Sequence, residues 1–330
     1  MCQLARFRSA VGAALAWMAG GVVALPEPSL AQPFPSKIIR IVSPAQPGGA
    51  TDVLARALSE AMQRALGQTV IIENRPGAGG NTGADQVAKA EPDGHTLLLS
   101  PAGPLTLNQF LYAKTPFDPG TAFAPITMVA DMPLVLVVHP KTKVGSVTEL
   151  VTAVKDGGKL SFGLSNIGGA NHLALLLFER SAGVSIAHVP YRGAAPVAHD
   201  LVAGQIEGAF INPPTVMSQI EDRQLTALAV VSDQRLAMLP DVPTIAQAGV
   251  PGVFGSTWFA LVAPAATPEP VIARLHAVTA AALREPALLE RFGRLGATLV
   301  GNTPAELGAY LKAERERWGP IIKQLNLRLE

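Results

Sequence analysis

The sequence predicts an α/β protein of two doubly wound lobes joined by two extended segments. Three observations support this fold class. Short β-branched runs alternate with helix-periodic runs along most of the chain, which is typical of parallel strands covered by helices on both faces. Two extended apolar runs, near Ala130 and near Trp258, interrupt the alternation. After the second run the chain is almost entirely helical, and these helices lack enough strands for a sheet of their own.

From this order we expect two lobes and a hinge. The closing helices are most simply placed on the first α/β unit, so that both extended runs cross between the units, and two such crossings describe a hinge. We therefore expect lobe 1 to comprise residues 32–130 and 254–330, and lobe 2 to comprise residues 131–253.

The individual elements follow from hydrophobic period and from Gly and Pro signals. The predicted strands cover residues 38–42, 68–73, 95–100, 126–138, 159–162, 185–189, 205–211, 225–231, 258–262 and 297–300. The predicted helices cover residues 53–66, 84–90, 147–155, 170–181, 194–203, 271–284, 286–295 and 304–325, and another opens at Asn212. We expect the 126–138 strand to be interrupted at Asp131 and Pro133, and residues 111–125 to be irregular.

Composition limits the classes of partner. The chain has 330 residues, enough for about two domains. Charged residues make up only 15%, the formal net charge is +1, and no basic run occurs, so no nucleic acid is expected as a partner. The six histidines show no metal-ligand spacing, so neither a metal nor another cofactor is expected. We take the protein to be a monomer.

The first residues predict export. Arg6 and Arg8 precede an apolar stretch over residues 9–25, and a small-x-small cleavage site ends at Ala31. This pattern is typical of a secretory signal peptide over residues 1–31, so we expect a periplasmic protein. The alternative is a membrane anchor, for which the apolar stretch is at the short end of spanning length. Cys2, the only cysteine, lies inside this segment, so the mature chain has no cysteine nucleophile or ligand.

A Gly-rich loop with the sequence SPAQPGGATD, residues 43–52, joins the first strand to the first helix. The first turn of a helix leaves backbone N–H groups unpaired, and glycine allows close approach to the backbone. The combination predicts a seat for a small anion. The alternative is an ordinary loop with a helix cap at Thr51 or Asp52. The candidate ligand residues of this lobe, with two from the loop after the third strand, are Ala45, Gln46, Gly48, Gly49, Thr51, Asp52, Ser100 and Ala102.

The second lobe offers a counterpart in the loop over residues 163–169, which follows a strand and precedes a helix. Two such loops on two lobes would clamp an anion between them, whereas the alternative is two unrelated loops. Arg192, on a neighbouring loop, could pair with a carboxylate or could be structural. The candidate ligand residues of this lobe are Ser165, Asn166, Gly168, Gly169, Asn171, His172, Tyr191, Arg192 and Asn212.

Enzyme motifs match poorly. The segment GLSNIG resembles a nucleophile elbow around Ser165, but that motif needs glycine where Ile167 stands. A dinucleotide fingerprint fails at Thr82, and the Walker and His-Glu-x-x-His motifs are absent. Asp52 could serve as a general base, although a charge in the first turn of a helix is a common structural feature. His172 is interpreted as a pocket or core histidine.

Several segments, taken together in order, carry a resemblance to a known family. They are PGGATD at 47–52, ENRPGAGGN at 73–81, AEPDGHTL at 90–98, PLVLVV at 133–138, ANHL at 170–173, HVPYRG at 188–193, LPDVPT at 239–244 and WFALVAP at 258–264. With these segments the chain resembles the solute receptors of tripartite tricarboxylate transporters, the Bug family of periplasmic binding proteins, from about residue 34 to its end.

The resemblance implies a type II periplasmic-binding-protein fold and no catalysis. It implies that the loops at 44–52 and 163–171 hold a carboxylate with backbone donors and ordered water, and that the loaded receptor delivers the ligand to inner-membrane permease subunits. Two alternatives stay open: a periplasmic hydrolase that uses Ser165 or Asp52, and a ligand sensor for a signalling partner.

The chain departs from the family pattern at three positions. Ala45 stands where an aromatic residue is usual, Leu164 where serine is usual, and Ile211 where an aspartate is common. A roomier and less polar pocket follows from these changes. We therefore expect a ligand bulkier or less polar than a small dicarboxylate or amino acid, such as an aromatic or branched monocarboxylate.

Overall fold

The computed structural model describes residues 34–165, 167–191, 193–294 and 296–329. Residues Pro35–Glu330 belong to one compact unit. The predicted signal peptide, 1–31, with Cys2, lies outside the described residues. Among the helices of the described ranges, none is long and apolar enough to cross a membrane.

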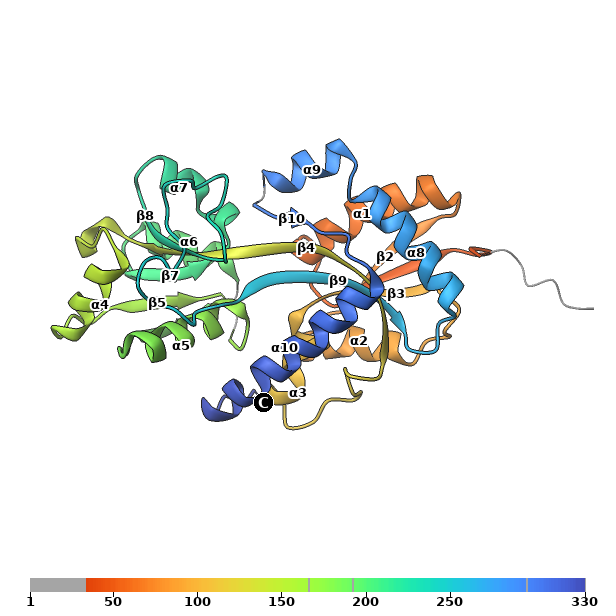
Figure 1. Ribbon diagram of the computed structural model, residues 1–330, viewed down its shortest axis with the longest axis horizontal. Coiled ribbons are helices and arrows are strands. Elements are labelled where there is room, and N and C mark those ends of the chain that lie inside the picture. The colour runs from red at the N-terminus through yellow and green to blue at the C-terminus, as the bar shows by residue number, and fades with distance from the viewer. Residues whose placement is uncertain (1–33, 166, 192, 295, 330) are drawn as a thin grey trace, which may run out of the picture. The chain divides into compact units, whose positions relative to one another are not determined.

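The strands join in the order β2-β1-β3-β9-β4-β7-β5-β6, with β8 and β10 also paired to β4 (Figure 1). Their bounds are β1 Ile39–Ser43, β2 Val70–Asn74, β3 Thr96–Pro101, β4 Phe123–Val138, β5 Ser161–Leu164, β6 Ala187–Pro190, β7 Gly208–Ile211, β8 Thr226–Val231, β9 Ser256–Pro264 and β10 Thr298–Leu299. At one end β1 pairs in parallel with β2 and β3, and at the other β5 pairs in parallel with β6 and β7. The two doubly wound halves predicted from the sequence are thus present, together with antiparallel β4 and β9.

The helices follow the predicted alternation. Their bounds are α1 Ala50–Leu66, α2 Asn81–Ala88, α3 Asn108–Leu111, α4 Val147–Lys155, α5 Ala170–Ala182, α6 Ala194–Val202, α7 Met217–Glu221, α8 Glu269–Ala282, α9 Pro286–Gly293 and α10 Pro304–Gln324. A π-helical segment, Gly103–Leu107, leads into α3, and the sequence pattern predicts neither of them. Both α1 and α2 begin three residues before their predicted starts, because the glycines before them are the N-caps.

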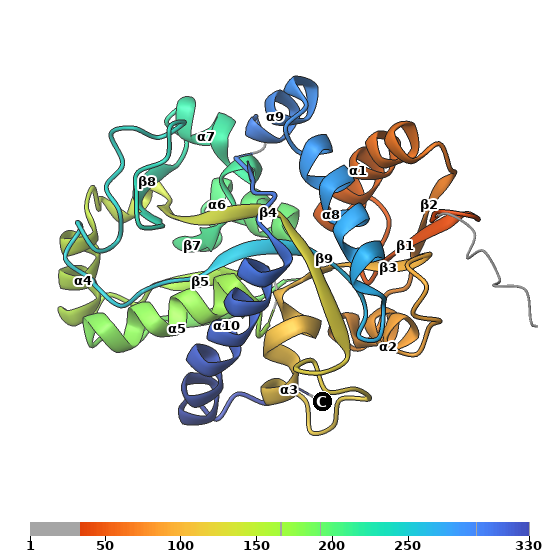
Figure 2. The same cartoon turned by 45° about the vertical axis from the view of Figure 1, so that its right-hand side comes forward.

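The two predicted crossings are β4 and β9, which lie side by side in both views (Figures 1 and 2). Ala130 pairs with Phe259 and Asp131 with Trp258, so the predicted crossing points face each other across one antiparallel ladder. The expected interruption at Asp131 and Pro133 is wrong, since β4 is continuous through both. Pro133 is the last residue of β4 that pairs with β9, so its missing N–H falls where the strand changes partners.

Helix α10 packs on both halves. Leu307 and Leu311 share a buried cluster with core residues of β1, β3 and β9. Trp318 and Ile322, further along the same helix, share a second cluster with Phe178 of α5 and other residues of the other half. The predicted lobe boundaries remain a prediction, and the end of α10 gives the two halves an additional connection.

Candidate functional site

The two predicted seats have the same local geometry. In the first, Gly48 has φ +82° and Gly49 is the extended N-cap of α1. In the second, Gly168 has φ +76° and Gly169 is the extended N-cap of α5. We call these segments, residues 48–52 and 168–172, the first and second glycine turns. A positive φ near these values is the left-handed region that glycine enters without a Cβ penalty, which explains the residue type at both positions.

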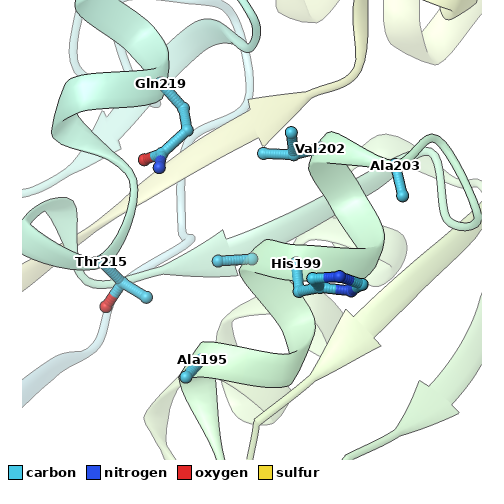
Figure 3. A pocket seen from close by; sticks show the side chains of 7 residues that line it. Ala195, His199, Val202, Ala203, Thr215 and Gln219 are labelled. Carbon is cyan, nitrogen blue, oxygen red and sulfur yellow. The ribbon is translucent and has the colours of Figure 1, made fainter.

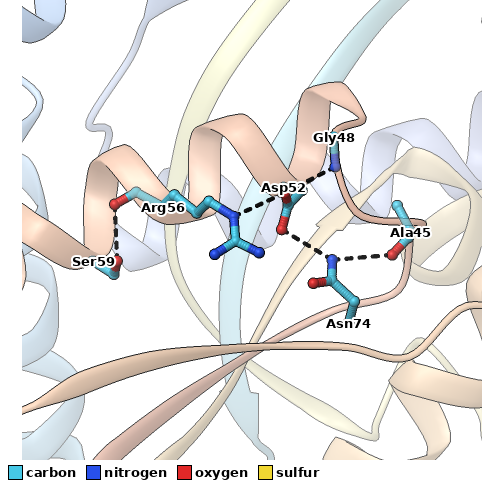
Figure 4. A network of polar contacts seen from close by, with 6 residues as sticks. All are labelled: Ala45, Gly48, Asp52, Arg56, Ser59 and Asn74. Atoms are coloured by element: carbon cyan, nitrogen blue, oxygen red, sulfur yellow. Dashed lines mark hydrogen bonds and ion pairs between the residues drawn. The ribbon is translucent and has the colours of Figure 1, made fainter.

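The third helical residue of each turn accepts a hydrogen bond from the first glycine. In the first turn the Gly48 N–H donates to Asp52 Oδ2 at 2.9 Å (Figure 4). In the second the Gly168 N–H donates to His172 Nδ1 at 3.0 Å. The alternative interpretation of a cap at Thr51 or Asp52 is therefore wrong in position: the N-cap is Gly49, without a side-chain cap, and Asp52 reaches back to the residue before it.

The Asp52 carboxylate is buried and accepts hydrogen bonds from three donors. Arg56 Nε donates to Oδ2 at 2.9 Å, and Asn74 Nδ2 donates to Oδ1 at 3.0 Å and also to the carbonyl of Ala45 at 3.2 Å (Figure 4). The hydrogen bond from Arg56, with those from Gly48 and Asn74, lowers the pKa of Asp52 to about 2 although burial opposes this. A carboxylate with so low a pKa is a weak base at neutral pH, so its environment suits a structural anion better than a general base.

His172 is buried and neutral. Burial lowers the pKa of His172 to about 4, and His188 adds to the shift while Glu179 opposes it. The ring of His188 meets that of His172 edge to face at 5.4 Å, and His188 Nε2 lies 3.0 Å from Glu179 Oε2. Because Nδ1 of His172 accepts a hydrogen bond from the Gly168 N–H, the proton of the neutral ring is on Nε2.

This arrangement offers unpaired donors to a ligand at both turns. The first three helical residues, Ala50 to Asp52 in α1 and Ala170 to His172 in α5, carry N–H groups with no intrahelical acceptor. In addition, Ser43 Oγ at the base of the first turn and Asn171 Nδ2 in the second are buried, and neither has a hydrogen-bond partner among the described residues. Buried polar atoms nearly always have partners in protein, solvent or ligand, so these two atoms are available to ordered water or to a ligand.

The remaining predicted ligand residues differ in burial and in their hydrogen-bond partners. Thr51 is buried, Gln46 is exposed and its carbonyl accepts the Gly49 N–H at 3.4 Å, and Ser100 donates to the carbonyl of Pro101. The Ala102 carbonyl accepts the Thr106 hydroxyl, and Ser165 is half-buried. Asn166 and Arg192 lie outside the described residues.

Tyr191 and Asn212 have structural partners. The Tyr191 hydroxyl donates to Asp200 Oδ2 at 2.8 Å, and burial, with that partner, raises the pKa of Tyr191 to about 12. Asn212 lies at the crossing, where its amide is 3.4 Å from the carbonyl of Met132 and 3.3 Å from the Thr257 hydroxyl. Its contacts are therefore with β4 and β9, while its assignment as a ligand residue stays a prediction.

Sequence reasoning missed four residues at the turns. Arg56 and Asn74 hold Asp52, and only Arg56 had a local signal, since it stands four residues after an acid on a helix. Leu111 and Leu329 lie against the second turn: a methyl group on Gly168 would be 3.0 Å from Leu111 Cδ1 and 3.1 Å from Leu329 Cδ1. The Leu329 N–H also donates to the carbonyl of Leu111 at 2.7 Å, a pairing for which the sequence gives no signal.

Two surface pockets lie elsewhere. One, of about 430 Å³, lies between α6 and α7 and is lined by Ala195, Ala198, His199, Val202, Ala203, Thr215 and Gln219 (Figure 3). The other, of about 510 Å³, is lined by residues at the starts of β1 and β3, including Lys37, Arg40 and His95. Neither pocket is lined by a residue of the glycine turns.

Comparisons with known proteins show the family of the chain. The family model described as the tripartite tricarboxylate transporter family receptor matches residues 54–327. Protein BugT of Bordetella pertussis is 37% identical over 305 residues, which cover 92% of this chain and 94% of BugT. The chain therefore belongs to the family of tripartite tricarboxylate transporter receptors, and to its Bug group, as the sequence segments predicted.

Solved structures confirm the two-lobe periplasmic-binding fold. The structure of R. palustris Rpa4515 with adipate has a TM-score of 0.79 and 33% identity, covering 90% of this chain and 100% of that one. MatC from Rhodopseudomonas palustris with bound malate has a TM-score of 0.76 and 30% identity, covering 88% of this chain and 100% of MatC.

Proposed function

We propose that this protein captures a small carboxylate in the periplasm between its two glycine turns and delivers it to a tripartite tricarboxylate-type permease. The observation that carries the proposal is the repeated turn: two helix N-termini on two halves of one chain present the same donors. Helix N-termini attract anions through unpaired N–H groups and the helix dipole. The relatives solved with adipate and with malate hold carboxylates, which agrees with the class of ligand.

Capture requires a difference between open and closed lobes. A ligand shifts that equilibrium only as far as it binds the closed state more tightly. One turn is available from each half, so only a closed arrangement offers both, and rotation about β4 and β9 would bring them together. The lobes in this proposal are 32–130 with 254–330, and 131–253.

The proposed ligand is larger or less polar than a short diacid. Ala45 is half-buried beside the first turn and stands where the family pattern has an aromatic residue, which favours an aromatic or branched monocarboxylate. Leu164 and Ile211 are buried in the hydrophobic core and do not add to this argument. We further propose that the protein acts as a monomer after removal of residues 1–31.

A thermal-shift panel on protein purified from the periplasm tests the function. It contains adipate, malate, benzoate and a branched aliphatic monocarboxylate, each beside its primary amide as an uncharged control. Stabilisation by acids but not by amides supports carboxylate capture, and mass spectrometry of material released from the protein identifies a retained ligand. Equal shifts from acids and amides, or turnover of candidate esters, would contradict a carboxylate receptor. Stabilisation by the diacids alone would contradict only the proposed monocarboxylate class.

A further inference from the structure

The third helical residue of each glycine turn accepts the same hydrogen bond, but one is a carboxylate and the other an imidazole. Asp52 and His172 each accept the N–H of a glycine with φ near +80°. Asp52 accepts as an anion paired with Arg56, and His172 accepts as an uncharged ring. The counterpart of Arg56, four residues after His172, is Leu176, so the second turn has neither the charge nor its compensation.

The Gly168 N–H depends on its acceptor more than the Gly48 N–H does. Gly168 is buried, so without Nδ1 its N–H would be left unpaired away from water, which costs more than the net contribution of a hydrogen bond. Gly48 is exposed, so water can replace Asp52 at its N–H. At the first turn the more important feature is charge: the buried Asp52 carboxylate lies in the same helical turn that would receive an anionic ligand, and Arg56 compensates it.

We propose, resting on the carboxylate-binding function above, that Asp52 with Arg56 and His172 are positioning residues for the ligand. Each acceptor holds its Gly-Gly turn in the conformation that leaves the first-turn N–H groups of α1 or α5 open to a carboxylate, without touching the ligand. Arg56 in addition cancels the charge of Asp52, so that the first turn presents no net negative charge to an anion.

The second turn is tested with His172→Asn and His172→Ala. Asparagine supplies a neutral oxygen acceptor, whereas alanine supplies none. His199→Ala is the matched control, because that imidazole is 82% exposed on α6. With adipate as the probe in calorimetric titrations, we expect H172N to stay within about 3-fold of the parent Kd and H172A to weaken it by about 10-fold or more. Equal affinity of H172A and the parent overturns the positioning role of His172.

The first turn is tested through charge. Arg56→Met leaves Asp52 buried without its counter-charge, and Arg64→Met removes an arginine from the last turn of the same helix as a control. We expect R56M to weaken adipate binding by about 5- to 10-fold and R64M to leave it unchanged. The double variant D52N/R56M removes both charges while keeping an acceptor for Gly48, so it should recover most of the loss. If R56M binds like the parent, or if the double variant is no better than R56M, charge compensation is refuted.

A readout without ligand separates this inference from the proposed function. Amide hydrogen exchange at Gly168 should be faster in H172A than in the parent and near the parent rate in H172N, whichever ligand the protein binds. If adipate and malate fail to bind the parent protein but exchange behaves as expected, the error lies in the ligand class and the positioning role stands. If exchange at Gly168 is the same in all three proteins, the positioning role is overturned even where adipate binds.

Discussion

Replacing Gly168 and Gly48 by alanine, one at a time, separates backbone strain from packing at the two glycine turns. Both glycines have positive φ, +76° and +82°, so both substitutions carry a similar conformational penalty. Their surroundings differ. A Cβ on Gly48 meets nothing within 4 Å, whereas a Cβ on Gly168 lies 3.0 Å from Leu111 and 3.1 Å from Leu329.

The expected magnitudes follow from these distances. A left-handed backbone costs a non-glycine residue about 1–2 kcal/mol, which is the whole effect expected for G48A. Overpacking adds about 1–3 kcal/mol in a filled site, so G168A should lose about 2–5 kcal/mol of the free energy of unfolding. The entropy of unfolding is about 2.1 cal/mol/K per residue, so in a chain of this size 1 kcal/mol corresponds to a shift of about 1.5–2 °C in Tm, which thermal unfolding followed by circular dichroism resolves.

The control variant removes the Leu329 side chain and keeps the positive φ at residue 168. The double variant G168A/L329A relieves one of the two close contacts, so it should be less destabilised than the sum of its single variants. Equal losses for G48A and G168A, together with additivity in the double variant, would show that the two leucine side chains move aside at no cost. That result would refute the conclusion that the C-terminal segment packs tightly on the second turn.

Three further predictions concern groups buried within the halves and at their junction. Urea unfolding should show a loss of stability as pH falls from 6.5 to about 4, because His172 of the unfolded chain takes up a proton in that range, whereas the ring in the folded protein does so only near pH 4. In H172N the dependence of stability on pH should be weaker over this range, and an unchanged dependence would contradict a neutral buried ring. A second loss of stability should extend from pH 3.8 to about pH 2, because protonation removes the interactions of Asp52. Other carboxyl groups with lowered pKa values, such as Asp93 and Glu207, contribute in the same range, so D52N should reduce this step while leaving the first intact, and a step of unchanged size would contradict the assignment to Asp52. Glu314→Leu should cost about 1–3 kcal/mol and alter tryptophan fluorescence, since it removes the acceptor of the buried Trp318 indole N–H at 3.0 Å. E314Q keeps an acceptor and should cost less, and similar losses for both variants would argue against the hydrogen bond.

Local signals predicted the parts of the site that depend on local structure. Consecutive glycines between a predicted strand and an apolar-periodic run predicted both turns, because strand ends and positive φ are set within a few residues. Asp52 was expected only in part: a charge in the first turn of the helix was predicted, but the N-cap is Gly49 and not Thr51 or Asp52. The hydrogen bond from Asn74 was not expected, since β2 lies beside β1 only after the sheet forms, and residue 74 is then opposite Ser43.

Features that arise from long-range pairing were missed or misjudged. Asp131 and Pro133 argued for a break in β4, because an acid and a proline are poor strand residues, but their places in the ladder and at the change of partners override that preference. The contact of Leu329 with Leu111 joins residues more than two hundred positions apart, and no sequence period reports such a pair. The same holds for Asn212, whose neighbours Met132 and Thr257 come from two distant strands.

The position of β9 constrains the order in which the chain can assemble. Although it is the ninth strand along the sequence, it lies between β3 and β4, so the sheet around β1–β3 stays incomplete until residues 256–264 are available. Strands β5–β8 and the second half of β4 pair with one another without any residue beyond Val231, although Val230 of β8 also forms a bridge with Thr244. Because long-range strand pairing is slow, the half built from the middle of the sequence should acquire its sheet first and the half containing the N-terminal strands last.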